Sequence, residues 1–350
     1  MSVNKIKDQY RGCLLGGGIG DALGWPVEFL KYKEIIRKYG TEGITDLKIT
    51  SSGFSEITDD TQMTLFTAEG LLRAETRGRN KGICHIPTVV YFAYQRWLYT
   101  QGYPKIVDKG WIYDGCLMEI KELHHQRAPG NSCLSALAKE ELGTVEQPIN
   151  NSKGCGGVMR IAPIGLVFPK EMAFKMAVDC AALTHGHPSG YLSAGTLAYI
   201  IAELVEGEEL EDAITNSLLE LKKNRGHEEC STLIEKAIEL STSETAPLKA
   251  ITKLGEGWVG EEALAISIYC ALKYKNSFDK ALITAVNHDG DSDSTGTITG
   301  NILGAYLGIN QIPSRWVKKV EMSSLITQLA DDLLIRYSDS EEWWDKYPGY

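Results

Sequence analysis

Two short acidic clusters are the residues of this chain whose types and spacing best suit metal chemistry. The first is Thr58-Asp59-Asp60-Thr61 and the second is Asp291-Ser292-Asp293-Ser294. Each places two carboxylates and two hydroxyl groups within four residues. Ligand sets made only of oxygen suit hard cations such as Mg²⁺, Mn²⁺ or Ca²⁺. If the fold brings the clusters together, they could hold one or two metal ions between them.

Helix capping is the alternative explanation, because each cluster also begins a segment with helical apolar periodicity. Threonine is a good N-cap, and acidic residues in a first turn suit the helix dipole. Capping explains either cluster better when that cluster is taken alone. Asp291 and Asp293, however, alternate with hydroxyl residues after a glycine, which is more charge than a cap needs. The two roles are compatible. An EF-hand is excluded, because counting from Asp289 puts Ser294 and Gly300 where such a loop needs glycine and glutamate.

Glycine-rich segments offer contact between a ligand and bare backbone. Gly16–Gly24 nearly matches a dinucleotide-binding fingerprint, but its third glycine falls one residue late and no strand precedes it, which excludes a Rossmann site. The loop Gly154–Gly157 lacks the lysine of a Walker A motif. Its backbone N–H groups could cradle a pyrophosphate, although a surface turn explains the loop equally well.

Single side chains provide further candidates for acids, bases or nucleophiles. Cys155 could be a nucleophile with His185 or His187 as its base. One cysteine among eight scattered ones is weak evidence, however, and packing of a small side chain explains it better. Helix capping also explains the two histidines. Glu28 follows the glycine-dense segment and is a candidate acid or base, with a solvated surface glutamate as the alternative.

Composition restricts the partners of the protein. A formal net charge of −10 argues against a general nucleic-acid binder or a binder of anionic membranes. No Cys-x-x-Cys pair is present, which disfavours a structural zinc site. The segment Met1–Tyr10 is polar, and no apolar run approaches the ~18 residues of a membrane span. These features predict a cytoplasmic protein with reduced cysteines and with no nucleic-acid or membrane partner.

The apolar periodicity that must position these groups is helical almost throughout. Only Ile44–Thr50 shows the alternation of apolar and polar residues that is typical of a strand, and it is short. Two loop-like regions, 102–131 and 143–163, are long enough to be functional. Because no βαβ alternation occurs, the sequence predicts an all-α fold, organised as one domain over residues 1–350. Helices are predicted from Asp59 onward and over Pro87–Tyr99, Ser132–Leu142, Glu171–Leu183, Tyr191–Val205, Leu210–Lys223, Ser231–Leu240, Glu261–Tyr274, Phe278–Val286, Ser294–Leu307 and Ser323–Arg336.

Glycine density marks two segments for close packing. Six glycines fall between Gly12 and Gly24, and glycines recur every four residues from Gly296 to Gly308. Each glycine disfavours a helix by roughly 1 kcal/mol relative to alanine, so this density implies a close approach of backbones. We expect the two glycine-rich helices to pack against each other near a common centre.

Six motifs, in order over nearly the whole chain, resemble those of the ADP-ribosylglycohydrolases. The similarity is to the group of dinitrogenase reductase-activating glycohydrolase and the ADP-ribosylarginine hydrolases. One such motif would be weak evidence, whereas six in order are specific. The motifs are GDALG (Gly20–Gly24), TDDTQMT (Thr58–Thr64), RAPGNSC (Arg127–Cys133), SKGCGGVMRIAPIG (Ser152–Gly165), LTHGHP (Leu183–Pro188) and GDSDSTG (Gly290–Gly296).

The resemblance implies a compact, mostly orthogonal multi-helix fold and a binuclear site for two Mg²⁺ (or Mn²⁺) ions. It implies that His185 contacts the substrate, that Asn131 lies close by, and that Asp21 supports the metal ligands from behind. The implied ligands are Thr58, Asp59, Asp60, Asp291, Asp293 and Ser294. The implied binding loop for pyrophosphate and ribose comprises Lys153, Gly154, Cys155, Gly156, Gly157, Val158, Met159 and Arg160.

The activity that the resemblance implies is hydrolysis of the N-glycosidic bond of ADP-ribosyl-arginine on modified proteins. Asp60 is the first candidate for the general acid or base, and Glu28 is the second. Ser294 makes the second cluster look closer to arginine-specific members than to those acting on serine-linked ADP-ribose. Two alternatives remain: hydrolysis of serine-linked or free ADP-ribose derivatives, and a binding protein that gives immunity by blocking a cognate ADP-ribosyltransferase. The second is disfavoured, because GDALG is reached by residue 20, which leaves no N-terminal extension to plug such a partner.

Overall fold

The computed structural model describes residues 3–350, and within that range the secondary structure is helical. This confirms the prediction of an all-α fold. β pairing in the same residues is limited to two isolated bridges, Ser55 with Val320 and Gly154 with Val259. The α-helices are α1 (Val3–Gly24), α2 (Tyr32–Tyr39), α3 (Asp59–Lys81), α4 (Ile86–Thr100), α5 (Asn131–Leu137), α6 (Ala162–Val167), α7 (Lys170–Ala182), α8 (Pro188–Glu206), α9 (Leu210–Leu221), α10 (Glu228–Thr242), α11 (Pro247–Leu254), α12 (Gly260–Lys273), α13 (Phe278–Val286), α14 (Ser292–Leu307), α15 (Ser314–Lys319), α16 (Ser323–Ile335) and α17 (Glu341–Lys346).

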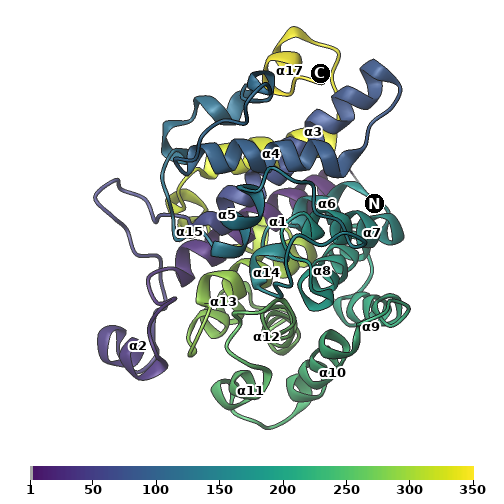
Figure 1. Ribbon diagram of the computed structural model, residues 1–350. Coiled ribbons are helices and arrows are strands. Elements are labelled where there is room, and N and C mark those ends of the chain that lie inside the picture. The colour runs from purple at the N-terminus through teal and green to yellow at the C-terminus, as the bar shows by residue number, and fades with distance from the viewer. Residues whose placement is uncertain (1–2) are drawn as a thin grey trace.

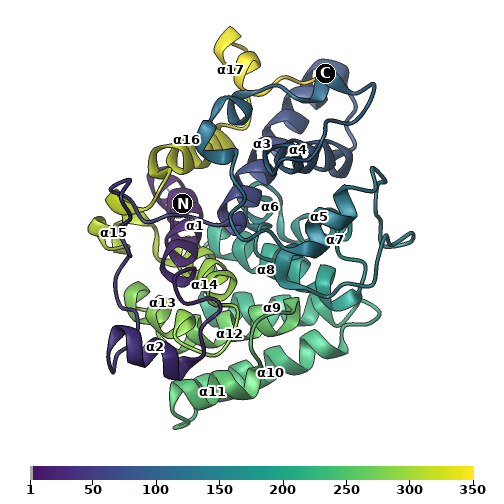
Figure 2. The same ribbon diagram turned by 60° about the vertical axis from the view of Figure 1, so that its left-hand side comes forward.

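Helices α1 and α14 lie side by side in the middle of the molecule (Figures 1 and 2). Helices α3 and α4 lie on one side of this pair, and α10 to α12 lie on the other. Short 3-10 helices occur in the connections, at Gly110–Ile112, Cys116–Glu119, Lys121–Leu123, Cys155–Gly157 and Ile309–Gln311. No helix within residues 3–350 is both long enough and apolar enough to cross a membrane.

The central pair is antiparallel, and its glycines set how closely the two backbones approach. A Cβ atom on Gly20 would lie 2.0 Å from the carbonyl oxygen of Gly296, and one on Gly300 would lie 2.0 Å from that of Gly16. Real Cβ contacts are never this short, so only glycine fits. Farther along α1, Gly24 faces the backbone of Ser292. The close packing that the glycine pattern predicts is therefore present, and it places the end of α1 beside the start of α14.

Most predicted helices differ from the observed ones by a few residues at their ends. The largest change is in α5, which ends at Leu137, because Glu140 has a φ of +57° and a right-handed helix cannot continue through that angle. Ile44–Thr50, the segment whose alternation resembles that of a strand, forms no strand. Its backbone pairs with a side chain instead: Asn287 accepts from the N–H of Ile44 at 2.8 Å and donates to its carbonyl at 2.9 Å.

Candidate active site

The first acidic cluster is held in place by a carboxylate from another helix. Asp21, near the end of α1, accepts hydrogen bonds from the backbone N–H groups of Thr58 and Thr61, at 2.9 and 3.1 Å, and from the Thr61 hydroxyl at 2.5 Å. Thr58 is also the N-cap of α3, because its hydroxyl accepts from the N–H of Asp60. The first turn of α3 is thus fixed, and both Asp59 and Asp60 are presented from it.

The second cluster begins α14 in the same way. The Asp291 side chain is the N-cap and accepts from the N–H of Ser294 at 3.2 Å. Asp293 accepts from the same N–H at 2.9 Å. Both clusters are therefore helix caps, as the simpler explanation requires. Capping occupies only part of each cluster, so the carboxylates stay available for other contacts.

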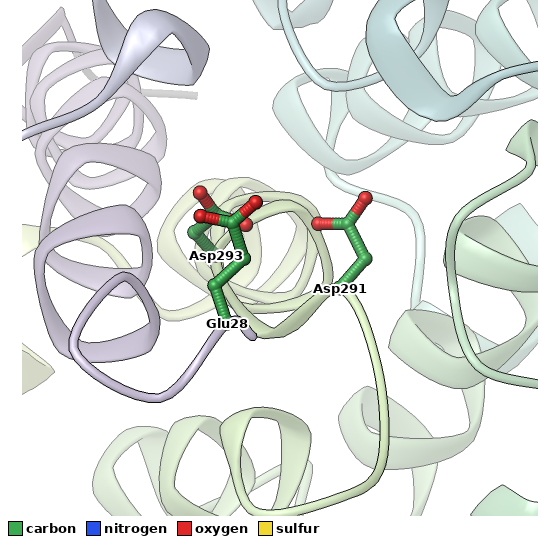
Figure 3. A group of neighbouring side chains, drawn as sticks. All are labelled: Glu28, Asp291 and Asp293. Atoms are coloured by element: carbon green, nitrogen blue, oxygen red, sulfur yellow. The ribbon is translucent and has the colours of Figure 1, made fainter. Parts of the chain in front are cut away.

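Tertiary packing brings the two clusters and Glu28 to one cleft. Carboxylate oxygens of Glu28, Asp291 and Asp293 all lie within 4.8 Å of one another, and the three residues are buried. Figure 3 shows Glu28, from the connection after α1, meeting the two aspartates at the start of α14. The cleft has a volume of ≈ 380 Å³ and is also lined by Asp59 and Asp60. Five carboxyl groups therefore share its walls.

These acids have no cationic side chain to balance them, since no Lys or Arg among the described residues lines the cleft. Burial, with the neighbouring Asp293, Asp291 and Asp59, raises the pKa of Glu28 to about 11. Burial and Asp293 raise the pKa of Asp60 well above its usual range. The same two causes raise the pKa of Asp21 to about 7. Acids that resist ionisation this strongly need protons or a bound cation.

A divalent cation fits this donor set. Oδ1 of Asp60 is buried and has no hydrogen-bond partner among the described residues, although the residue is only 2% exposed. A buried carboxylate oxygen without a partner is costly unless something absent from the protein satisfies it. The grouped acids offer oxygen donors alone, which is the chemistry of Mg²⁺, Mn²⁺ and Ca²⁺ sites. The buried acidic triad could therefore hold metal.

The glycine loop lines the same cleft and adjoins the acids, because Sγ of Cys155 donates to Oδ2 of Asp291 at 2.8 Å. Gly154, Cys155, Gly156 and Met159 line the cleft, as do Asn131 and His185 from other elements. A Cβ atom on Gly156 would lie 2.9 Å from Sγ of Cys133 and 3.1 Å from Cε1 of His185, so a side chain there would have to displace this wall. Backbone anchors the loop to the start of α12, since the N–H of Cys155 donates to the carbonyl of Trp258 at 3.2 Å.

His185 is uncharged and has one nitrogen free for a ligand. Burial and nearby Arg160 lower the pKa of His185 to about 3. Arg160 donates to the Thr184 hydroxyl at 2.7 Å, and that hydroxyl lies 2.8 Å from Nδ1 of His185. If the hydroxyl proton lies on this short contact, the ring proton is on Nε2, the atom that faces Gly154 and Gly156. The wall then presents an N–H donor beside the loop.

Several residues expected to touch a ligand lie outside the cleft. Thr58, Gly157, Val158 and Arg160 are buried and do not line it. For Arg160 the expected direct contact is wrong, because the side chain is 0% exposed and its guanidinium lies 4.2 Å from the centre of the Tyr94 ring. Lys153 points into a different hollow, where its amino group pairs with Glu261 at 2.7 Å and Glu229 at 3.1 Å.

The cleft also contains residues that the sequence did not single out. Phe29 and Trp258 line it and stack on each other, with ring centres 5.9 Å apart, and both are exposed. Gly130 lines it as well, and its N–H donates to Asp59 at 3.3 Å. The motif Arg127–Cys133 was a signal for the Gly130 segment. Nothing in the spacing of Phe29 and Trp258, far apart in the sequence, pointed to their pairing.

Comparison with known proteins now decides the family. The sequence model of the ADP-ribosylglycohydrolase family matches residues 2–342. The chain belongs to the ADP-ribosylglycohydrolase family. It is a hydrolase of that family, and every family-like motif except Gly20–Gly24 contributes residues that line the cleft.

Relatives with named activities are similar over most of their length. An ADP-ribosyl-[dinitrogen reductase] glycohydrolase of Rhodospirillum rubrum is 25% identical, with 92% of this chain and 93% of the relative aligned. An ADP-ribosylhydrolase ARH3 of Bos taurus is 26% identical, covering 89% of this chain and 88% of that protein. An ADP-ribosylarginine hydrolase Tri1 of Pseudomonas putida is 24% identical, covering 96% and 80%. A solved structure titled "ADP-ribosylglycohydrolase-related protein complex" has the same fold, with a TM-score of 0.63 at 23% identity, over 95% of this chain and 99% of that one.

Proposed function

We propose that this protein hydrolyses the N-glycosidic bond between ADP-ribose and an arginine side chain of a modified protein. The observation that carries the proposal is the single cleft that is lined both by five carboxyl groups and by a glycine loop. A guanidinium leaving group is cationic, and a cleft lined by acids without a Lys or Arg among the described residues favours it. Relatives named for arginine-linked ADP-ribose support the same linkage.

The glycine loop and the acids have separate roles in binding. Gly154 and Gly156 would lie along the pyrophosphate, because their lack of side chains lets a ligand approach the backbone. His185 would donate from Nε2 to a phosphate or ribose oxygen. We assign the metal ligands to Asp59, Asp60, Asp291, Asp293 and Ser294. Thr58, expected as a further ligand, does not line the cleft and would instead hold the first turn of α3 in place as its N-cap. A bound divalent cation, or a pair of them, would supply Lewis acidity for holding ribose hydroxyls and orienting water.

Asp60 is the proposed general acid or base. Asp60 lines the cleft and its buried Oδ1 has no partner among the described residues, so this carboxyl group is available to hold or accept a proton. Glu28 is the second candidate. Its raised pKa keeps it protonated in the metal-free protein, as a group that donates a proton must be. Asp21 would hold the first turn of α3, and with it Asp59 and Asp60, in position without touching the ligand.

The direct test is release of ADP-ribose from a defined ADP-ribosyl-arginine protein, measured with and without EDTA. We expect release that EDTA stops and that Mg²⁺ or Mn²⁺ restores. Release that continues undiminished in EDTA, in protein freed of metal beforehand, would contradict the metal assignment. No release from this substrate in the presence of either metal would contradict the arginine linkage.

Serine-linked ADP-ribose is the second candidate substrate, and a specific finding favours testing it. The relatives named ADP-ribosylhydrolase ARH3, a name that specifies no linkage, are as similar to this chain as those named for arginine, so similarity by itself does not select the arginine linkage. Turnover of arginine-linked and serine-linked ADP-ribose by the same preparation separates the two. We expect the arginine-linked substrate to be hydrolysed faster, and the reverse order would replace the proposal with the serine-linked one.

A further inference from the structure

The thiol of Cys155 lies directly against the acidic cluster. Its Sγ donates to Oδ2 of Asp291 at 2.8 Å, and the hydroxyl of Ser294 donates to the same sulfur at 3.6 Å. Cys155 lines the cleft and is only partly buried. A soft sulfur donor thus stands among the oxygen donors of a site otherwise suited to hard cations.

The contacts of Cys155 do not suit a nucleophile. Burial and the Asp291 charge raise the pKa of this thiol well above its usual range, so the reactive thiolate is disfavoured. The hydrogen bonds of the Cys155 sulfur go to Asp291 and Ser294, and none joins it to a histidine in the described part of the chain. The thiol proton instead lies on the contact with Asp291, at a position where a metal ion could replace it.

An independent observation points to a cation at the same place. Oδ1 of Asp60 is buried without a partner in the described part of the chain, and Asp60 lines the cleft together with Cys155. Asp291 is also a member of the triad whose oxygens lie within 4.8 Å of one another. Asp291 therefore joins the sulfur to the acidic triad.

We propose that Cys155 gives this site a second mode, in which a thiophilic divalent cation of the Zn²⁺ class binds the Cys155 sulfur together with Asp291 and excludes Mg²⁺ and Mn²⁺. The inference rests on the metal site in the proposed function. When the metal–sulfur bond forms, the S–H bond breaks and its proton goes to solvent, with no change of oxidation state. Thiolate and carboxylate are both ordinary zinc ligands, whereas Mg²⁺ and Mn²⁺ select oxygen.

Cys155→Ser is the matched variant for the test. It keeps a small side chain and a hydrogen-bond donor to Asp291 but replaces the soft donor by a hard one. Metal-free protein is titrated with Cd²⁺, a thiophilic probe with a thiolate charge-transfer band in the ultraviolet, and separately with Zn²⁺ and Mn²⁺ by calorimetry. We expect Cys155→Ser to lose the cadmium band and at least about tenfold in affinity for Cd²⁺ and Zn²⁺, while Mn²⁺ affinity stays within about twofold.

Two control variants identify the sulfur responsible. Cys84 is also partly buried. Cys84→Ser should leave the cadmium charge-transfer band unchanged when one equivalent of Cd²⁺ per site has been added. Met159 is the other sulfur in this wall, 3.8 Å from the Ser294 hydroxyl, and Met159→Leu should keep the cadmium band. Unchanged binding of Cd²⁺ and Zn²⁺ by Cys155→Ser, with Mn²⁺ still bound, would overturn this inference and leave the proposed function standing. Wild-type protein that binds neither Mn²⁺ nor Cd²⁺ at this cleft would overturn both.

Discussion

Asp21 accepts a hydrogen bond from the hydroxyl of Thr61 at 2.5 Å, and this contact joins the last turn of α1 to the first turn of α3. The same α1 packs through its glycines against α14, whose start carries Asp291 and Asp293. One helix therefore positions both acidic clusters. Substitutions that disturb the packing of α1 should therefore displace the acidic clusters, even though no residue of α1 lines the cleft.

Loss of Asp21 should weaken metal binding without removing a ligand. In Asp21→Asn, an amide NH₂ replaces an oxygen that accepts from backbone N–H groups, so donors would face donors. We expect a loss of about 1–3 kcal/mol in the free energy of unfolding and of about 10–100-fold in Mn²⁺ affinity. Denaturant titration and calorimetry measure the two effects. Asp212→Asn, on an exposed turn of α9, is the control and should change neither.

Asp60 and Asp293 should matter most for activity. Asp60→Ala removes the proposed acid or base, and Asp293→Ala removes a member of the buried triad. We expect each to lower ADP-ribose release by about 10²–10⁴-fold while the helical circular dichroism spectrum stays intact. Both variants retaining wild-type release would rule out this cleft as the active site.

Replacing a glycine by alanine should be destabilising at the α1–α14 contact but not at an open position elsewhere. A Cβ atom in Gly300→Ala would overlap the carbonyl of Gly16, a backbone atom that cannot move aside. We expect a loss of at least about 1–3 kcal/mol in stability. Gly78 in α3 offers the comparison, because a Cβ there meets only Cys84, at 3.9 Å, and Gly78→Ala should stabilise by about 0.5–1 kcal/mol. Equal thermal midpoints for the two variants would contradict the packing argument.

The metal-free protein should lose stability as the pH rises from about 4 to 7. Burial raises the pKa of Asp21 from 3.8 to about 7 and that of Glu28 from 4.5 to about 11, so the folded chain keeps protons that the unfolded chain releases in this interval. The stabilisation from bound protons is complete below about pH 4 and declines above it. Divalent cations compete with these protons, so their effect should grow over the same range.

Thermal midpoints with and without Mn²⁺, at about pH 5 and about pH 7.5, test this linkage. We expect the larger increase on adding Mn²⁺ at the higher pH. Asp293→Asn serves as the control, because it removes a triad carboxylate and should reduce the increase at both values. An increase that is the same at the two pH values in wild-type protein would show that metal does not replace protons on these acids.

The Thr184 hydroxyl should affect substrate binding through His185. Thr184→Val keeps the shape of the side chain but removes the group between Arg160 and His185. We expect a rise in KM larger than the fall in kcat, because the imidazole loses its orientation while the acidic wall is untouched. Thr184→Ser keeps the hydroxyl and should behave like wild type. A fall in kcat alone would place His185 in the chemical step instead.

Sequence patterns predicted local structure well wherever the controlling interactions are local. Thr58 is an N-cap and α3 begins at Asp59 as predicted, whereas α14 begins at Ser292, before the predicted Ser294, with Asp291 as its N-cap. Ile44–Thr50 forms no strand despite its alternation, and its contact with the amide of Asn287 is a long-range one that no local pattern reveals. Family motifs indicated Asn131, His185 and the glycine loop, and the first two line the cleft together with Gly154, Cys155 and Gly156 of the loop.

Sequence alone determined the helical class, the family motifs and the two acidic clusters, because periodicity, capping and residue type are local properties. Only the tertiary structure decided which residues share a wall. Arg160 and Lys153 do not line the cleft. The buried guanidinium of Arg160 donates to Thr184, and the ammonium of Lys153 pairs with the carboxylate of Glu261. The tertiary structure also brought Cys155 to Asp291 and Phe29 to Trp258, contacts set by backbone packing between distant segments.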